Sequence, residues 1–314
     1  MTLLVADVGG TNTRIALIRE GAGLSDLERY RNDDFSSFSK VLTRYGEARD
    51  LSGLAESCIA VAGPVASGRA RLTNRDWSFD QATIATALPP LTTGSVHVIN
   101  DLVALGFALP GLKPDQLTLI RPSSEGGPVN NQSLVAGVGT GFNICVVRST
   151  PDGPVVIEAE LGHACLPANV SKALAEVLGD EAAQFVTYEH LFSGRGLSRL
   201  YRLLSGGKEY AGSRVVAGYD PGQRDAFAQT VEMTARMLGV AARELVFQYL
   251  PFGGIHFAGG AARGVLGSAA KGVFLEALTA PGPFSDHIAQ VPIKVIVDDA
   301  AALTGAVRYT RMMA

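Results

Sequence analysis

Short apolar runs that end at glycine or another turn-forming residue recur along the chain, and this pattern predicts buried strands. The first run, Leu3 to Val8, ends at Gly9-Gly10, and apolar residues resume between Arg14 and Arg19. Two strands joined by a tight β-turn are therefore expected at the N-terminus. Comparable runs predict further strands at 58–62, 96–99, 255–258 and 291–297.

Other segments carry apolar residues at helical spacing. The segment from Leu102 to Leu109 is predicted to form a helix that Pro110 stops, and 225–249 shows a longer pattern of the same kind. Helices are also expected at 171–178 and 300–309. Because strands and helices alternate throughout, the predicted fold class is α/β.

The segment LVAGVGTGFNICVV at 134–147 predicts a strand, a glycine turn and a second strand. It repeats the order of elements expected at the N-terminus, and two such arrangements in one chain indicate two related domains. Segments rich in proline, glycine and serine, at Pro110–Pro114 and Ser123–Asn131, are candidate linkers.

Length and composition fit a globular chain with more than one domain. The 314 residues correspond to about two domains at ~150 residues each. With 47% hydrophobic and 18% charged residues, the chain is too apolar to be disordered. The net charge of -3 arises from 27 basic and 30 acidic residues, so no electrostatic surface for nucleic acid is indicated. The 36 glycines cluster in short loops, which excludes a collagen-like chain.

Cysteines and the N-terminal segment bear on the compartment. Cys58, Cys145 and Cys165 are too few and too widely spaced for a disulfide framework or a structural zinc site. The opening MTLLVADVGG lacks the basic region of a signal peptide, and no apolar run reaches the ~18 residues that a membrane span needs. A reducing, cytoplasmic location is the expectation.

The turn after the first predicted strand has the composition of an anion-binding loop. Gly9 and Gly10 would let the backbone take positive φ and approach a ligand closely, and successive N–H groups of such a turn attract phosphate. The Thr11 hydroxyl and the Asn12 amide can add donors, and Asp7 could hold a metal ion through water. A plain hairpin remains the alternative for this turn taken alone.

Two further glycine turns follow predicted strands, at 137–141 and at 258–260. The first of them, GVGTG, fits neither the Walker pattern nor the dinucleotide-binding pattern. A hairpin needs one such turn, whereas a nucleotide with a base and several phosphates could use all three. The three turns together therefore favour nucleotide binding.

Polar residues next to predicted strands suggest where a second substrate binds. Asp101 follows a buried strand, so it could either cap the next helix or accept a proton from a substrate hydroxyl. Glu160 and His163, with Glu189 further along, could accept hydrogen bonds from several hydroxyl groups. Their spacing makes a metal site a weak alternative. Trp77, with Asn74, could serve packing or substrate contact, and the remaining histidines are expected to be structural, at positions 97, 190, 256 and 287.

Taken together, these motifs resemble the bacterial glucokinases of the non-ROK group, within the superfamily of hexokinases, actin and heat-shock ATPases. The resemblance spans nearly the whole chain, and the order and spacing of the motifs match the family. It is carried by DVGGTNTR at 7–14, AVAGPV at 60–65, TNRDW at 73–77, INDLVALGFALP at 99–110, GVGTGF at 137–142, ELGH at 160–163, EHLFSGRGLSRLY at 189–201 and FAGGAARG at 257–264.

The resemblance implies a role for each matching residue. Asp101 would be the general base, and the sugar hydroxyls would be held by Asn100, Glu160, His163 and Glu189. Asp7 would hold Mg²⁺ through water. Three segments would bind ATP. The first phosphate loop would consist of Ala6, Asp7, Val8, Gly9, Gly10, Thr11 and Asn12, and the second of Gly139, Thr140 and Gly141. The adenosine element would consist of Gly259 and Gly260.

The implied fold is the two-domain, ribonuclease H-like fold of actin-like ATPases, with a central cleft between the domains. Residues 1–111 and 300–314 would form a small α/β domain, and residues 112–299 a large α+β domain. The implied activity is phosphorylation of D-glucose at O6 by ATP with Mg²⁺, as a glycolytic transferase of the cytoplasm. The resemblance also implies a homodimer with no nucleic-acid or membrane partner.

Two departures refine this assignment. The cysteine-rich zinc signature of ROK sugar kinases is absent, which favours the other group. Leu161 stands where the family often has glycine, so the fine shape of the sugar pocket is left open. The alternatives are a kinase for fructose, mannose or N-acetylglucosamine, a non-catalytic sugar sensor, and an actin-like ATPase. A sensor with a DNA-binding segment is disfavoured because the first phosphate loop already starts at Asp7.

Overall fold

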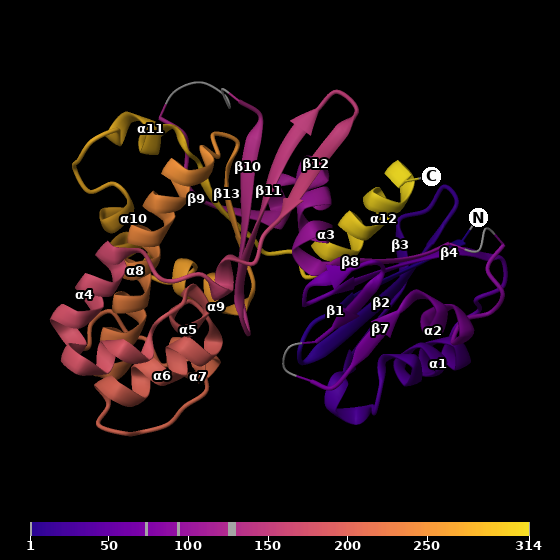
Figure 1. Cartoon of the computed structure of the whole chain (residues 1–314), viewed down its shortest axis with the longest axis horizontal. Coiled ribbons are helices and arrows are strands. Elements are labelled where there is room, and N and C mark those ends of the chain that lie inside the picture. Colours follow the sequence, from indigo (N-terminus) through magenta and orange to yellow (C-terminus); the bar gives the residue numbers. More distant parts are fainter. Residues whose placement is uncertain (1, 73–74, 93–94, 125–129, 314) are drawn as a thin grey trace. The chain divides into compact units, whose positions relative to one another are not determined.

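A computed structural model of the protein describes residues 2–72, 75–92, 95–124 and 130–313. The chain divides into two compact units (Figure 1). Unit 1 contains residues 1–112 and 299–314, and unit 2 contains residues 113–298. Asn74, which the sequence offers as a substrate contact, lies outside the described residues.

Unit 1 is built on a five-stranded sheet. In spatial order its strands are β3 (Leu24–Arg31), β2 (Asn12–Arg19), β1 (Thr2–Val8), β4 (Leu54–Val61) and β8 (Ser95–Asn100). The β1–β2 pair is an antiparallel hairpin, whereas β1, β4 and β8 run parallel. Because parallel strands end at one edge of a sheet, the segments that follow β1 and β8 emerge on the same side, where α/β folds bind ligands.

Helices cover both faces of this sheet, since alternate residues of β1 and β2 point to opposite faces. Leu4, Ala6 and Val8 pack on the side of α1 (Phe38–Ala48), whereas Leu3 and Val5 pack on the side of α3 (Asp101–Ala108) and α12 (Ala301–Met313). Unit 1 also contains η1 (Asn32–Asp34), α2 (Gln81–Thr86), η2 (Leu109–Gly111) and a small sheet of β5 (Val65–Ala66), β6 (Arg69–Arg71) and β7 (Ser78–Asp80).

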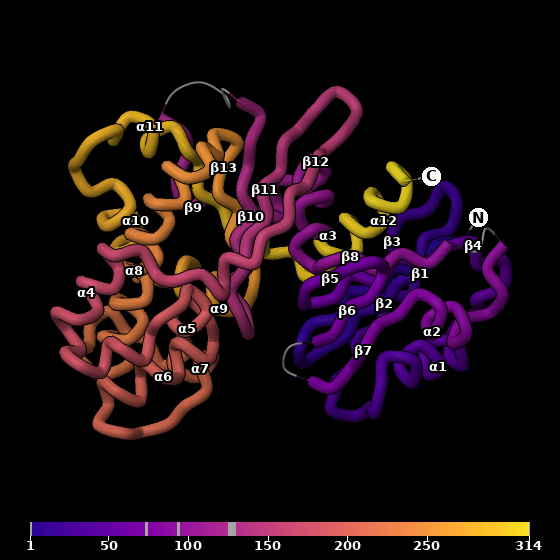
Figure 2. The backbone as a smooth tube through the Cα atoms, in the orientation of Figure 1, coloured from indigo at the N-terminus to yellow at the C-terminus, as the bar shows by residue number. Residues whose placement is uncertain are grey.

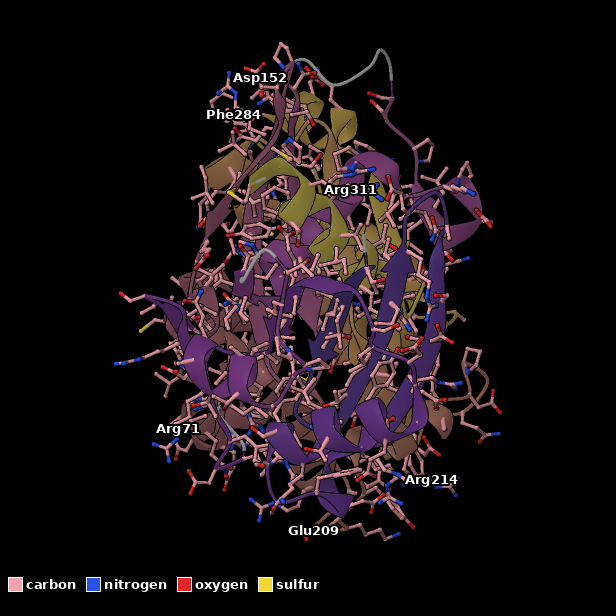
Figure 3. The ribbon with its side chains drawn as sticks, turned by 90° about the vertical axis from the view of Figure 1, so that its right-hand side faces the viewer. Arg71, Asp152, Glu209, Arg214, Phe284 and Arg311 are labelled. Carbon is pink, nitrogen blue, oxygen red and sulfur yellow. The ribbon has the colours of Figure 1, made fainter. Side chains whose placement is uncertain are left out.

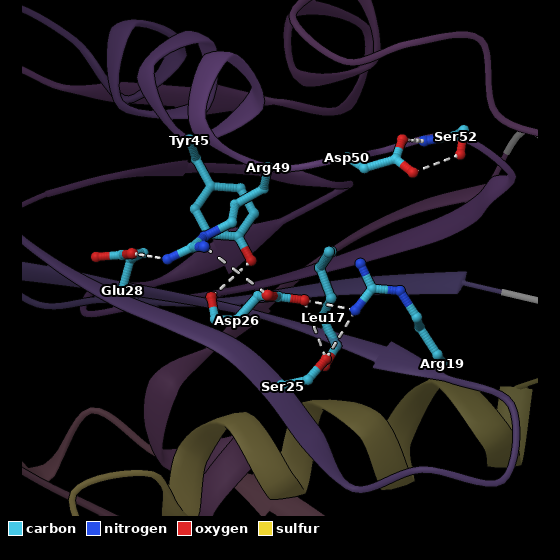
Figure 4. A network of polar contacts seen from close by, with 9 residues as sticks. All are labelled: Leu17, Arg19, Ser25, Asp26, Glu28, Tyr45, Arg49, Asp50 and Ser52. Carbon is cyan, nitrogen blue, oxygen red and sulfur yellow. Dashed lines mark hydrogen bonds and ion pairs between the residues drawn. The ribbon is translucent and has the colours of Figure 1, made fainter.

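A network of polar contacts ties the outer strand β3 to its neighbours (Figure 4). Arg19 on β2 donates to Asp26 on β3 at 2.5 Å, and this hydrogen bond holds the pKa of Asp26 below its usual value. The buried Tyr45 of α1 donates to the Asp26 carbonyl at 2.8 Å, and Arg49 pairs with Glu28. Strand β3 is only partly buried and is held in the sheet by its antiparallel pairing with β2, to which these surface contacts make a small addition.

Unit 2 contains a six-stranded sheet with the same hairpin arrangement. In spatial order its strands are β12 (Gly153–Glu158), β11 (Phe142–Thr150), β10 (Gln132–Val138), β13 (Gly254–Ala258), β14 (Ile293–Ile296) and β9 (Leu117–Arg121). The β10–β11 pair is antiparallel, and β10 runs parallel to β13. Gly137 pairs with Ala258, so the turns that follow β10 and β13 start side by side.

One large core joins this sheet to the helices of unit 2. The backbone course of these elements can be followed in Figure 2. The long α8 (Ala226–Tyr249) contributes many buried residues, such as Val231, Leu238 and Leu245. The exposed side chains of Glu209, Arg214 and Phe284 mark the periphery of the unit (Figure 3). The other helical elements are η3 (Pro114–Gln116), η4 (Leu161–His163), α4 (Ala168–Leu178), η5 (Gly179–Gln184), α5 (Tyr188–Leu191), α6 (Gly194–Leu204), α7 (Gly212–Ala217), α9 (Gly260–Leu266), α10 (Lys271–Leu278) and α11 (Ser285–Gln290).

The predicted strands and helices are all present, with ends displaced by a few residues, and the α/β class is confirmed. Of the two candidate linkers, Pro110–Pro114 contains the boundary between the units after Leu112. The interpretation of Ser123–Asn131 as a linker is wrong, because the residues on both sides belong to unit 2. Among the described residues, no helix is both long and apolar enough to span a membrane.

Candidate functional site

The first glycine turn connects β1 to β2 and is closed by a backbone hydrogen bond, in which the Gly9 N–H donates to the Asn12 carbonyl at 3.0 Å. Gly9 does not use the positive φ that glycine permits and stays outside the left-handed region. The turn spans four residues and reverses the chain without that conformation. A Cβ at Gly9 would also make only an ordinary contact with the Asn12 carbonyl, at 3.5 Å.

Asn32 holds this turn in place through hydrogen bonds. Its side chain is fully buried, its amide donates to the Gly9 carbonyl at 2.8 Å, and its amide oxygen accepts from the Thr13 hydroxyl at 2.8 Å. Its backbone N–H donates to the Thr11 carbonyl at 2.9 Å. Three hydrogen bonds from one buried residue therefore set the position of the turn. The sequence analysis missed Asn32, because no local pattern relates it to a turn twenty residues earlier.

Asp7 is the penultimate residue of β1 and lies opposite Arg14 in the hairpin. The Arg14 guanidinium donates to the Asp7 carboxylate at 3.2 Å and also lies 3.5 Å from the Asp299 carboxylate. Burial raises the pKa of Asp7, while the neighbouring Arg14 opposes this shift. Arg14 thus provides the positive charge that keeps a carboxylate in this poorly hydrated position.

Asn100 ends β8 and Asp101 begins α3. The cap of this helix is Asn100, whose amide oxygen accepts from the N–H groups of Leu102 and Val103 at 2.9 and 3.3 Å. Its amide group also donates to the Gly63 carbonyl at 2.9 Å. The cap position therefore belongs to Asn100, although the Asp101 carboxylate also accepts from the Leu102 N–H at 2.9 Å. Asp101 is half-buried at the first position of the helix, next to the carboxyl edge of the sheet.

In unit 2 the second and third glycine turns lie against each other. Gly259 adopts φ 95°, and a Cβ at this position would lie 2.6 Å from the Val138 carbonyl, so only glycine fits. Its Cα lies 4.0 Å from the Cβ position of Gly139. The Gly139 N–H donates to the Gly141 carbonyl at 2.9 Å, and the Gly139 carbonyl accepts from the Gly194 N–H at the start of α6.

Glu189 adjoins the second turn. Its carboxylate occupies the space that a side chain at Gly141 would need, accepts from the Phe142 N–H at 3.2 Å and pairs with Arg195 at 2.6 Å. The Glu189 side chain is 25% exposed. One carboxylate thus connects the glycine turn to α6. The sequence analysis did not single out Arg195.

Glu160 and His163 lie in the same region. Glu160 interacts electrostatically with both His163 and Glu189, so the three residues are near one another. Partial burial of its carboxylate raises the pKa of Glu160, although the residue as a whole is exposed. His163 is exposed, and its backbone N–H donates to the Glu160 carbonyl at 3.2 Å.

Asn143 and Gly162 hold this segment on the sheet. The Asn143 amide oxygen accepts from the Leu161 N–H at 3.0 Å, and its side chain also hydrogen-bonds to Glu160. Gly162 presses against the Phe142 carbonyl so closely that no side chain fits, whereas Leu161 packs on the core. A leucine side chain thus fits at position 161, whereas only glycine fits at position 162. Asn143 follows GVGTGF directly, and only this proximity could have drawn attention to it.

Trp77 proves to be a core residue. Trp77 is 3% exposed within the core of unit 1, with the Arg75 guanidinium over its ring at 5.3 Å. All three cysteines are free, and only Cys165 is exposed. Among the described residues, no three His, Cys, Asp or Glu side chains cluster as a metal site.

Comparisons with known proteins point to one family. The family model described as Glucokinase matches residues 4–313. A glucokinase from Saccharophagus degradans is 27% identical to this chain, over 98% of this chain and 97% of its own length. The crystal structure of a glucokinase from an Antarctic psychrotroph has a TM-score of 0.79 at 27% identity, covering 99% of this chain and 98% of that one.

A structure from the other group of sugar kinases shares the fold at lower similarity. It is a ROK family glucokinase from Streptomyces griseus, determined in complex with glucose and AMPPNP. It has a TM-score of 0.65 at 16% identity and covers 99% of each chain. These likenesses confirm the expected fold of the actin-like ATPases.

Proposed function

Because the chain belongs to the glucokinase family, we propose that it transfers the terminal phosphoryl group of ATP to O6 of D-glucose, with Asp101 as the general base. The observation that carries the proposal is the convergence in unit 2 of two glycine turns with Glu160, His163 and Glu189. The turns offer backbone N–H groups for phosphates, and the three side chains offer acceptors for sugar hydroxyls. A nucleotide and a sugar could therefore bind next to each other.

The sugar is held by hydrogen bonds in this proposal. The carboxylates of Glu160 and Glu189 accept from hydroxyl groups, and Asn143 keeps the Glu160 segment in place. Glu189 already accepts from Phe142 and Arg195, so these contacts orient its carboxylate before the sugar arrives. Preorganised acceptors reduce the entropy that binding costs. Asn100 is assigned to the sugar as well, although its amide also caps α3.

Asp101 acts on the attacking hydroxyl. It orients the O6 hydroxyl of glucose and accepts its proton as the bond to phosphorus forms. Its place at the start of α3 is fixed by the Asn100 cap, so the carboxylate has a rigid support. Phosphoryl transfer depends mainly on positioning and charge neutralisation, and a carboxylate of ordinary basicity is sufficient for this late proton transfer.

The residues of the first turn fit a Mg²⁺–nucleotide complex. Asp7 supplies a carboxylate at the end of β1, next to the turn that Asn32 fixes. Mg²⁺ is commonly held by one or two carboxylates together with water and substrate phosphates, so a site with few protein ligands suits it. Bound there, Mg²⁺ neutralises charge on the phosphates. We assign Ala6 to Asn12, Gly139 to Gly141, Gly259 and Gly260 to the nucleotide.

The roles proposed for the two units rest on membership of the family. The two compact units are proposed to be the small and large domains, and their closure on the sugar would exclude water from the reaction. A kinase for another hexose is the nearest alternative, because the sugar-facing groups in unit 2 would also hold other sugars.

Substitution of Asp101 by alanine tests the central role. The variant is expected to lose about 10²–10⁴-fold in kcat, because the O6 hydroxyl loses its proton acceptor, and to retain glucose binding and the native circular dichroism spectrum. Asp115, an exposed residue of η3 in unit 2, provides the matched control, and Asp115→Ala should turn over normally. Near-normal kcat in the Asp101 variant would refute the base assignment.

A further inference from the structure

A pocket of about 550 Å³ lies next to the segment that carries Glu160 and His163. Leu161 and Ala164 of that segment form part of its wall, together with residues from the start of α4 and from α8. Its size is within the range of small-molecule sites. It is not part of the glycine turns, and nothing in the proposed reaction occupies it.

Cys165 lines this pocket and is the one exposed cysteine of the chain. It follows His163 by two residues, and it pairs with Thr187 in an isolated β-bridge that joins the His163 segment to the start of α5. A group attached to the Cys165 sulfur would therefore lie next to two chain segments, the one that carries Glu160 and His163 and the one that leads to Glu189.

A tyrosine hydroxyl in the pocket wall has no hydrogen-bond partner among the described residues. Tyr188 is 2% exposed and lines the pocket, yet none of the described residues hydrogen-bonds to its hydroxyl. Its ring is fixed by stacking on Phe142 at 5.3 Å between centroids, so the hydroxyl cannot turn away. The Tyr188 side chain is buried except where it lines the pocket, so water or a ligand in the pocket can complete its hydroxyl. The hydroxyl thus offers a ligand a fixed hydrogen-bonding position that does not depend on the cysteine.

The remaining polar groups define the chemistry of that ligand. Asn169 and Gln248 offer amide groups, and Glu244 offers a carboxylate that accepts from the Asn169 amide at 2.9 Å. Amides and a hydroxyl pair well with peptide bonds, and a carboxylate pairs with an ammonium group. This set suits a small peptide that carries a free amino group, joined to the protein through sulfur.

We propose that the pocket is a modification site in which Cys165 exchanges with a low-molecular-weight peptidic disulfide and thereby weakens glucose binding. The Cys165 thiolate attacks one sulfur of the disulfide, a new S–S bond forms to Cys165, the original S–S bond breaks, and the departing thiolate takes up a proton. No further oxidant is needed. The effect on glucose rests on the proposed function, whereas formation of the adduct does not.

The coupling follows from the backbone contacts of the segment. The Tyr188 N–H donates to the Ala164 carbonyl at 3.1 Å, and the Leu166 N–H donates to the Val186 carbonyl at 2.9 Å. A group held in the pocket would press on these connections, and Glu189 directly follows Tyr188. Small displacements of binding groups have large effects on affinity. By reciprocity, glucose should slow formation of the adduct.

Oxidised glutathione is the probe, applied to the native full-length chain. Intact-mass analysis should find one glutathionyl adduct, located at Cys165 by peptide mapping, while the buried Cys58 and Cys145 react only after unfolding. The adduct should raise the glucose KM by about tenfold or more, leave the ATP KM within error, and be reversed by dithiothreitol. Cys165→Ser and Cys165→Ala should bind glucose normally and be insensitive.

Tyr188→Phe tests whether the pocket recognises the peptide, because it removes only the hydroxyl. Adduct formation with oxidised glutathione should slow several-fold in this variant, and that with the small uncharged hydroxyethyl disulfide should not. Native protein without an adduct at Cys165 would overturn the site. An adduct that leaves the glucose KM unchanged would overturn the coupling. Absence of glucose turnover in unmodified protein would instead count against the proposed function.

Discussion

The buried side-chain amide of Asn32 holds the first glycine turn in position. Asn32→Ala should raise the ATP KM and lower the free energy of unfolding of unit 1 by about 1–3 kcal/mol, because the Gly9 carbonyl and the Thr13 hydroxyl lose their partner. Steady-state kinetics give the KM. Fluorescence of Trp77, the only tryptophan of the chain, reports unfolding of the unit that contains it.

Thr13→Val is the matched control for that variant. It removes the hydroxyl bond to Asn32 but leaves the bond from Asn32 to Gly9, so it should destabilise unit 1 with a smaller effect on the ATP KM. Equal increases of the ATP KM in the two variants would contradict the view that the Gly9 contact positions the turn.

Glu160 provides a pH-dependent test of the sugar contacts. Partial burial of its carboxylate raises its pKa, and only the charged form offers both oxygens as acceptors. The glucose KM should therefore rise as the pH falls toward this raised pKa, at a higher pH than an ordinary glutamate would produce. Glu160→Gln should weaken glucose binding at every pH and remove this dependence. A change confined to the ATP KM would exclude the assigned role.

Individual residues also show where inference from the sequence stops. Asp7, Glu160 and Glu189 could be singled out because each stands next to a recognisable motif. Asn32 and Asn143 could not, since their importance arises from contacts with distant backbone groups. The conformation of Gly9 could not be predicted either, because a glycine in the sequence permits positive φ without requiring it.

At the scale of elements, the glycine turn after β13 has the strictest requirement. Gly259→Ala should destabilise unit 2 by about 1–3 kcal/mol and impair ATP binding, because φ 95° and the nearby Val138 carbonyl both exclude a Cβ. At Gly260 a Cβ meets no atom within 4 Å, so Gly260→Ala should cost much less stability. Thermal unfolding of both variants makes the comparison, and equal losses would contradict it.

The elements that the sequence analysis found are those with continuous apolar patterns, such as β1, β10 and α8. Helix α1 was missed although Phe38, Val41, Leu42 and Tyr45 recur at helical spacing. Other missed elements lack such a pattern for physical reasons. Strand β3 is largely polar, and β12 exposes Val155 and Ile157 at the edge of its sheet. Helix α6 begins with two glycines in its first three residues, which masks its helical propensity.

For the whole molecule, the family and its fold could be recognised from motif order, because the glycine turns and the polar residues between them keep their spacing along nearly the entire chain. The boundary of unit 1 after Leu112 lies within the proline- and glycine-rich segment Pro110–Pro114, and the assignment of the units as domains stays a prediction. Homodimer formation and a cytoplasmic location stay predictions, since they depend on surfaces and conditions beyond a single chain.

The most direct test of the account is a coupled assay of ADP release with MgATP and a panel of hexoses, including fructose, mannose and N-acetylglucosamine. Turnover with glucose is expected to exceed turnover with each other sugar, and no turnover is expected without sugar. Strong preference for another hexose would keep the phosphoryl-transfer chemistry but contradict glucose as the substrate. Folded protein that binds ATP yet turns over no sugar would contradict the proposed activity itself.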